Sequence, residues 1–243
     1  QDPSVTVGTS GTQAVNLNSG DTAQTSGGSF TFVLTGATST LNSFIVSETS
    51  ASLAAQTDLT SVKFQTDTDG TYPGTDVTGC TTLSFTVSDQ ITCTPTGGLS
   101  LSTTVRYVYI VFDLASTATG GETIEVQITN PSTDVSVTGA SNTDTAAKAI
   151  AGATTVKPKI TGYTNSTEPA LDYAASCAGC GARIGPASIS KSQTIVISGF
   201  GFGADPGAGS RDTVTNKVEI VGTATTLLTD NVGSTNVTAW SAT

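Results

Sequence analysis

The chain has 243 residues, a formal net charge of −10 and a sequence pI of about 4.1. This excess of acidic groups repels nucleic-acid phosphates and anionic lipid surfaces, which argues against both as partners. Only 12% of the residues are charged, whereas 36% are hydrophobic and recur with strand periodicity. A packed β protein with a hydroxyl-rich surface is therefore favoured over a disordered chain, and no apolar run approaches the roughly 18 residues of a membrane span.

Residues 1–28, "QDPSVTVGTSGTQAVNLNSGDTAQTSGG", precede the first clear strand and are expected to form an N-terminal extension. Two short pieces within them, "SVTVG" and "QAVNL", alternate apolar and polar residues as strands do. Their apolar positions are Val5, Val7, Val15 and Leu17. The chain contains no Met and begins at Gln1, which we interpret as a mature, secreted protein whose signal peptide has been removed.

Residues 29–152 are predicted to form an antiparallel β-sandwich, immunoglobulin-like or jelly-roll-like. Seven short strand-like segments are separated by turns rich in Ser, Thr, Gly and Asp. They read "SFTFVLTG", "LNSFIVSET", "SVKFQTD", "LSFTVS", "VRYVYIVFDL", "ETIEVQITN" and "DVSVTG". The fifth is apolar on both faces, which predicts a central strand, while residues 141–152 have modest helical propensity and are expected to link the two halves.

The four cysteines occur as two local pairs, Cys80 with Cys93 and Cys177 with Cys180. The first pair flanks "LSFTV", the turn "SDQ" and "ITC", as expected for a disulfide across a hairpin. A Cys₄ zinc site and a thioredoxin-like C-x-x-C are the alternatives, but the first pair is too widely spaced for a zinc knuckle and glycines surround the second. Disulfides are favoured, and they imply an oxidising, extracellular compartment.

The segment "DTDGTYPGTD", residues 67–76, is the most suggestive ligand-binding stretch. Asp67, Asp69 and Asp76 offer oxygens to a calcium ion, although Asp and Gly are also the ordinary residues of a hairpin loop. Calcium is therefore an optional ligand, and no cofactor is required. Tyr72 and Trp240 are the aromatic residues expected nearest the surface, where a sugar could stack on them.

The stretch "ISGFGFGADPG", residues 197–207, has the glycines of a phosphate loop but is followed by a strand pattern instead of a helix. Together with "NKVEIVGTATTLLTD" and "TNVTAWSAT", it resembles the IPT/TIG immunoglobulin-like domain of bacterial surface proteins, over about residues 158–243. The resemblance implies a second domain at 153–243, in which the following residues form the turn and core of the motif: Gly199, Phe200, Gly201, Phe202, Gly203 and Trp240. In that family another strand follows the W-S-x-T segment, whereas this sequence ends at Thr243, so the domain is expected to lack its final strand or strands.

The absence of histidine removes the usual general base and every Ser-His-Asp triad, so the chain is predicted not to be an enzyme. An immunoglobulin-like sheet that lacks a strand can accept one from a neighbour. The sequence thus predicts an extracellular filament or pilus subunit, a homopolymer in which Val5, Val7, Val15 and Leu17 of one copy enter the groove of the next. The alternatives are a surface adhesin or stalk module of a longer protein, and a carbohydrate-binding module of a secreted hydrolase.

Overall fold

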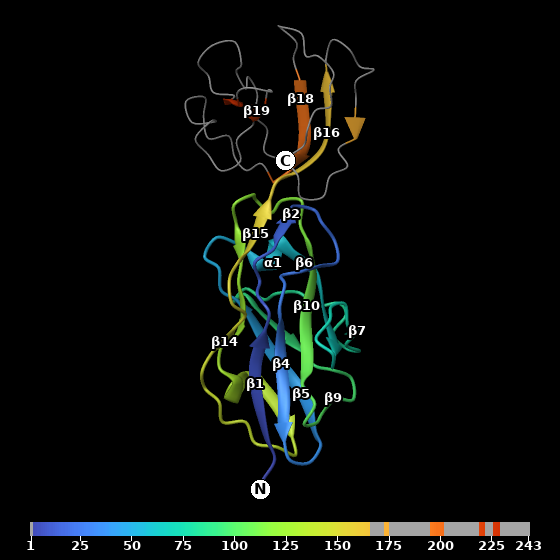
Figure 1. Ribbon diagram of the computed structural model, residues 1–243, viewed down its shortest axis with the longest axis vertical. Helices are drawn as coiled ribbons and strands as arrows, with labels where there is room; N and C mark the ends of the chain where they lie inside the picture. Colours follow the sequence, from blue (N-terminus) through green and yellow to red (C-terminus); the bar gives the residue numbers. More distant parts are fainter. Residues whose placement is uncertain (1, 166–172, 175–194, 202–218, 222–225, 229–243) are drawn as a thin grey trace. The chain divides into compact units, whose positions relative to one another are not determined.

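The computed structural model describes residues 2–165, 173–174, 195–201, 219–221 and 226–228 (Figure 1). Within these residues the regular secondary structure is almost entirely β-strand, arranged in antiparallel sheets, which confirms the predicted all-β class. The only described helices are α1 (Ala55–Asp58) and α2 (Pro131–Asp134), each a single turn long.

The chain divides into two compact units. Unit 1 comprises Gln1–Leu17, Asp21–Ala115 and Thr123–Thr155, and unit 2 comprises Asn18–Gly20, Ser116–Glu122 and Val156–Thr243.

The first sheet of unit 1 runs in the order β1-β4-β10-β6-β7, with β3 also paired to β10. Its strands are β1 (Ser4–Ser10), β3 (Gln24–Thr25), β4 (Ser29–Thr35), β6 (Leu59–Asp67), β7 (Thr75–Asp76) and β10 (Arg106–Leu114). As predicted from its two apolar faces, β10 is central, and it pairs with β4 on one side and β6 on the other.

The second sheet of unit 1 is built around the long strand β5 (Ser39–Glu48), in the order β13-β5-β12-β14, with β8 and β9 also paired to β5. Its other strands are β8 (Gln90–Cys93), β9 (Leu99–Leu101), β12 (Val126–Ile128), β13 (Val135–Thr138) and β14 (Lys148–Ala149). A third sheet runs in the order β11-β15-β2, from β11 (Thr123–Ile124), β15 (Thr154–Lys157) and β2 (Asn16–Asn18).

Three phenylalanines join the two main sheets of unit 1. Phe44 of the second sheet lies between Phe32 and Phe64 of the first, with ring centroids 5.8 and 4.9 Å away, and all three side chains are fully buried. The two sheets therefore pack face to face over a common apolar core, as in a β-sandwich.

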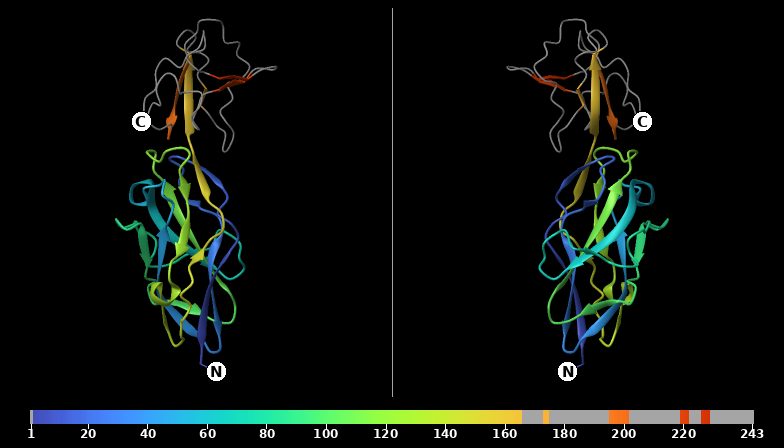
Figure 2. Two further views of the ribbon diagram at one scale, coloured as in Figure 1. Left: turned by 90° about the vertical axis from the view of Figure 1, so that its left-hand side faces the viewer. Right: turned by 90° about the vertical axis from the view of Figure 1, so that its right-hand side faces the viewer.

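The N-terminal residues are part of unit 1 and do not form the separate extension predicted for residues 1–28. Strand β1 pairs along its whole length with β4, from Ser4 opposite Thr35 to Ser10 opposite Ser29, and the two lie side by side in Figures 1 and 2. Val5 and Val7 are only 5% and 2% exposed, because the alternation that marks them as strand residues also turns them into the core.

The rest of the predicted donor segment is also held within unit 1. The Gln13 backbone N–H donates to the carbonyl oxygen of Ala151, and that of Thr155 donates to the carbonyl oxygen of Val15. Leu17 is buried, whereas Val15 is 37% exposed. The prediction that these residues are free to enter a neighbouring subunit is therefore wrong for the chain as it folds here.

Two local predictions are also corrected. Residues 83–88, "LSFTVS", alternate like a strand but form only an isolated bridge between Leu83 and Val62, and Val87 is 85% exposed. Residues 141–152 contain no helix, because this segment runs alongside other strands of unit 1 and contributes β14.

In unit 2 the described strands form two small sheets, ordered β17-β16-β18 and β19-β20. They are β16 (Lys159–Asn165), β17 (Tyr173–Ala174), β18 (Ile195–Phe200), β19 (Glu219–Val221) and β20 (Thr226–Leu228). Gly199 and Phe200 end β18, and Gly201 follows with φ +72, a left-handed conformation that favours glycine. Phe202, Gly203 and Trp240 lie outside the described residues.

Candidate functional site

A polar face covers part of the first sheet where β6 and β10 lie side by side. Tyr109 stands opposite Gln65, and Tyr107 stands opposite Asp67. Side chains alternate along a strand, so these four share the face turned away from the buried core residues Phe64, Val108 and Ile110. The loop between β6 and β7, residues 68–74, begins at the end of this face.

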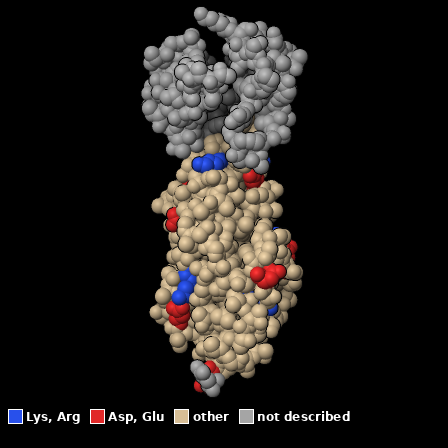
Figure 3. All heavy atoms as spheres, viewed as in Figure 1, with Lys and Arg blue, Asp and Glu red and all other residues tan. Residues whose placement is uncertain are grey.

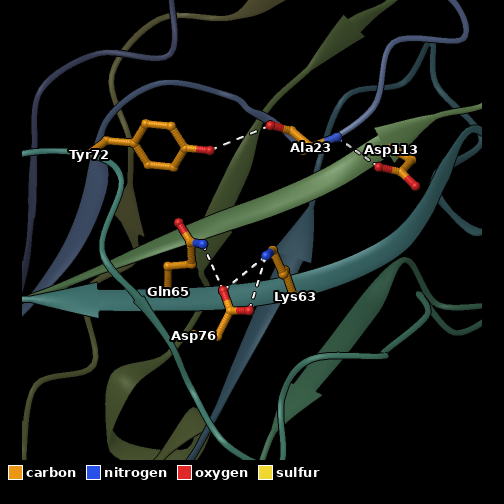
Figure 4. A network of polar contacts seen from close by, with 6 residues as sticks. All are labelled: Ala23, Lys63, Gln65, Tyr72, Asp76 and Asp113. Carbon is orange, nitrogen blue, oxygen red and sulfur yellow. Dashed lines mark hydrogen bonds and ion pairs between the residues drawn. The ribbon is translucent and has the colours of Figure 1, made fainter.

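Asp76 is held by two partners from β6 (Figure 4). Its carboxylate accepts a 2.7 Å hydrogen bond from Nε2 of Gln65 and lies 2.9 Å from Nζ of Lys63. The Gln65 hydrogen bond and the Lys63 ammonium lower the pKa of Asp76 from its ordinary value. Because this carboxylate is highly exposed, the pair contributes little to stability.

Asp67 and Asp69 shape the loop itself. Oδ1 of Asp67 accepts hydrogen bonds from the backbone N–H groups of Asp69 and Gly70, at 3.2 and 2.9 Å, and Oδ1 of Asp69 accepts one from Thr71 at 2.8 Å. These are the local bonds by which aspartate stabilises a turn. The loop therefore uses two of the three predicted calcium ligands for its own backbone.

Aromatic contacts hold the loop against the sheet. The Tyr72 ring meets the Tyr109 ring edge-on, with centroids 5.6 Å apart, and its hydroxyl donates to the carbonyl oxygen of Ala23 at 3.5 Å. Gly70 has φ +78, and a Cβ there would lie 3.1 Å from the Tyr107 ring. Tyr72 remains 38% exposed, as expected for an aromatic residue near the surface, and stacking of a sugar on its ring stays a prediction.

An open groove of about 590 Å³ runs beside this loop in unit 1. Asp67, Asp69 and Asp76 all line it, so the structure does bring the three predicted ligands to one place. Arg106 lines it too and donates hydrogen bonds to the Ser100 carbonyl oxygen and to Oγ1 of Thr66. The remaining lining is rich in threonine hydroxyls, so the groove offers oxygen atoms of both carboxylates and alcohols.

Three oxygen atoms of the polar face are buried without a hydrogen-bond partner among the described residues: Oε1 of Gln65, Oδ2 of Asp67 and the hydroxyl of Tyr109. Burial, followed by the interaction with Asp67, raises the pKa of Tyr109 above its ordinary value. Sequence reasoning identified Asp67 but missed the other two, because neither type of residue signals a ligand site by itself.

A buried carboxylate outside the polar face, Glu48 at the end of β5, was also missed. It is 5% exposed, and its Oε1 accepts 2.9 Å hydrogen bonds from the backbone N–H groups of Ser50 and Glu125. Its Oε2 has no partner among the described residues. Burial, reinforced by the nearby charges of Asp89 and Glu125, raises its pKa to about 7 in spite of the two backbone hydrogen bonds. The only sequence signal is a Glu that ends a long strand pattern.

The predicted disulfide between Cys80 and Cys93 is confirmed, and both residues are fully buried. It ties the segment after β7 to β8 across 13 positions of sequence. Cys177 and Cys180 lie outside the described residues. A disulfide of this kind indicates an oxidising environment.

Among the described residues, no group of three or more His, Cys, Asp or Glu side chains has the geometry to hold a metal ion. Calcium at Asp67, Asp69 and Asp76 thus stays a prediction. None of the helices in the described part of the chain is long and apolar enough to cross a membrane.

Comparison of the whole chain with protein-family models finds no match, and comparison with curated proteins finds none either. The IPT/TIG resemblance of residues 158–243 therefore stays a prediction.

Proposed function

We propose that this chain is a non-catalytic structural module of an extracellular protein, of the adhesin or stalk type. The observation that carries the proposal is the place of β1, whose Val5 and Val7 are buried in unit 1. A strand that completes its own sheet is not available to complete a neighbour's, which favours a self-contained module over a subunit that donates its N-terminus.

Two features support the extracellular part of the proposal. The Cys80–Cys93 disulfide suits an oxidising compartment. The surface is poor in charge, and Figure 3 shows only scattered acidic and basic side chains on the described part of the face in view. A hydroxyl-rich exterior with a net charge of −10 keeps such a module soluble without a dense field of ion pairs.

Light scattering after size-exclusion chromatography tests this function. We expect the full chain to remain monomeric over a wide range of concentrations. Head-to-tail polymers that disappear when residues 1–20 are removed, with folded monomers left behind, would instead support strand donation. Under our proposal the same deletion removes β1 and prevents unit 1 from folding.

A second candidate function, binding of a glycan, is favoured by the exposed ring of Tyr72. An aromatic face next to planar hydrogen-bonding groups is a common arrangement for sugar recognition, and Gln65 and Asp76 supply such groups close by. A glycan array probed with the intact chain and with a Tyr72→Ala variant tests it. Binding by the intact chain that the variant loses would support this function, and equal signals from both would reject it.

A further inference from the structure

The three unpartnered oxygen atoms of the polar face belong to one neighbourhood of unit 1. Gln65 and Asp67 are two positions apart on β6, so their side chains share a face, and Tyr109 is the cross-strand partner of Gln65. Each of the three oxygens has less than 1 Å² of exposed surface. Tyr109 as a whole is 4% exposed, so its hydroxyl lies well inside the protein.

The other polar atoms of these residues are already engaged, which fixes where the free oxygens point. Nε2 of Gln65 donates to Asp76, so Oε1 is turned away from that carboxylate. Oδ1 of Asp67 accepts from the loop backbone, which leaves Oδ2 for another partner. The Tyr109 hydroxyl is close enough to Asp67 for the two groups to interact, yet they do not form a hydrogen bond of normal geometry.

This neighbourhood has more unpartnered hydrogen-bond acceptors than donors. Oε1 of Gln65 and Oδ2 of Asp67 only accept, and the Tyr109 hydroxyl has one proton to donate. The described ion pairs join Lys63 to Asp76 and Lys148 to Asp144, so no described Lys or Arg forms an ion pair with Asp67. Buried oxygen acceptors without donors are costly, and Oδ2 of Asp67 belongs to a negatively charged carboxylate, which favours a positive partner.

We propose that Gln65, Asp67 and Tyr109 bind a hard cation through these three oxygens, and that the ion is Ca²⁺. Carboxylate, amide and hydroxyl oxygens are the ligands that hard cations prefer, and water fills the remaining positions around calcium. The carboxylates of Asp69 and Asp76 line the adjoining groove and make this part of the surface attractive to cations. The choice of Ca²⁺ rests on the proposed extracellular location.

This site differs from the one predicted from the sequence. It keeps Asp67 but replaces Asp69 and Asp76 with Gln65 and Tyr109, because Asp69 caps Thr71 and Asp76 is paired with Lys63. With a single carboxylate the affinity is expected to be low, with a Kd on the order of 10⁻⁴ to 10⁻³ M, as in other extracellular modules.

The test compares the intact chain with three variants, using calorimetric titration with Ca²⁺ and thermal unfolding with 10 mM Ca²⁺ or with EDTA. We expect Ca²⁺ to bind the intact chain and to raise its Tm by about 3 °C. Asp67→Asn keeps a turn-capping oxygen but loses the charge, and it should weaken binding at least about tenfold. Tyr109→Phe removes one ligand and should weaken binding as well. Asp144→Asn is the control, because it removes a carboxylate that is paired with Lys148 and is not part of the proposed site, and it should bind as the intact chain does.

A second readout uses Tb³⁺ as a probe for Ca²⁺, because tyrosines close to bound Tb³⁺ transfer excitation to it. The intact chain should show Tb³⁺ emission on tyrosine excitation, and Asp67→Asn should lose it. An intact chain that binds neither ion would show that these three oxygens do not form a cation site, and equal affinities of the intact chain and Asp67→Asn would place the ion elsewhere. Either result overturns the proposal, and if Asp67→Asn fails to fold, Tyr109→Phe decides.

Discussion

The side-chain amide of Gln13 donates a 2.6 Å hydrogen bond to the carbonyl oxygen of Ile150, 137 positions further along the chain. Its Oε1 accepts a 3.1 Å hydrogen bond from the backbone N–H of Val126, and the whole side chain is 1% exposed. One buried amide thereby satisfies two backbone groups and holds the N-terminal segment to unit 1.

Replacement of Gln13 by alanine is therefore expected to destabilise unit 1. The Val126 N–H and the Ile150 carbonyl would be left buried without partners, at a cost of about 2–4 kcal/mol. Urea unfolding measures the change. Gln24→Ala is the matched control, since Nε2 of Gln24 bonds only to the carbonyl oxygen of Thr22 two positions away, and its cost should stay below about 1 kcal/mol. Equal effects of the two substitutions would contradict this role for Gln13.

The disulfide should stabilise the same unit by restricting the unfolded chain. A double variant, Cys80→Ala with Cys93→Ala, opens a loop of 13 positions, for which the chain-entropy model gives about 3 kcal/mol. Chemical unfolding of the two proteins under identical oxidising conditions gives the difference. A double variant as stable as the parent chain would show that the disulfide does not stabilise unit 1.

The strands of unit 1 could be predicted from the sequence wherever the alternation is long. The patterns around Phe32, Phe44 and Phe64 each mark a strand that the structure contains, and the two apolar faces of β10 mark its central place. Alternation also marked Val5 and Val7, but it does not show what a strand pairs with. The residues that pair with β1 lie 19 to 31 positions further along the chain, and only the tertiary fold determines that pairing.

Local alternation of apolar and polar residues gave wrong or incomplete predictions where contacts between distant parts of the sequence determine the structure. Leu83, Phe85 and Val87 alternate like a strand, yet Val87 lies within the turn that the Asp89 N–H closes on the Thr86 carbonyl oxygen, and it is exposed. In the candidate site, the aspartates of the loop were visible in the sequence, but the approach of Gln65 and Tyr109 to Asp67 follows from strand register, which local sequence does not encode.

Glu48 makes the stability of unit 1 depend on pH. Its pKa is about 7 in the folded chain and 4.5 in the unfolded reference, so the folded state binds more protons between these values. Stability is then highest below about pH 4.5 and falls as the pH rises through 7, by about 3 kcal/mol for this group. Glu48→Gln should abolish that part of the dependence and should be the more stable protein at pH 8.

Unfolding free energies at pH 5 and pH 8 test this, with Asp89→Asn as a companion variant. Asp89 is a nearby negative charge that raises the pKa of Glu48. Its removal should therefore move the loss of stability to lower pH by less than about one pH unit, and the loss itself should remain. Parallel pH profiles for the intact chain and Glu48→Gln would contradict the assignment.

Gly70, in the β6–β7 loop, and Gly97, between β8 and β9, have nearly the same φ, so substituting each in turn separates backbone strain from side-chain contact. Gly97→Ala introduces a side chain at φ +76 with no other atom within 4 Å. It should therefore lower the free energy of unfolding only through the strain of alanine in the left-handed conformation, by about 1 kcal/mol. Gly70→Ala, at φ +78, also crowds the Tyr107 ring and should cost clearly more. Thermal unfolding compares them, and a larger loss for Gly97→Ala would show that the loop does not pack on the sheet as described.

Hydrogen exchange of the backbone amides of β1 in the intact, monomeric chain tests the central claim most directly. If Ser4–Ser10 complete the first sheet of unit 1, the amides that β1 directs to β4 should exchange about as slowly as the paired amides of β4. Exchange at the rate of an unstructured peptide, with β4 still protected, would show that the N-terminal strand is free and would contradict the account.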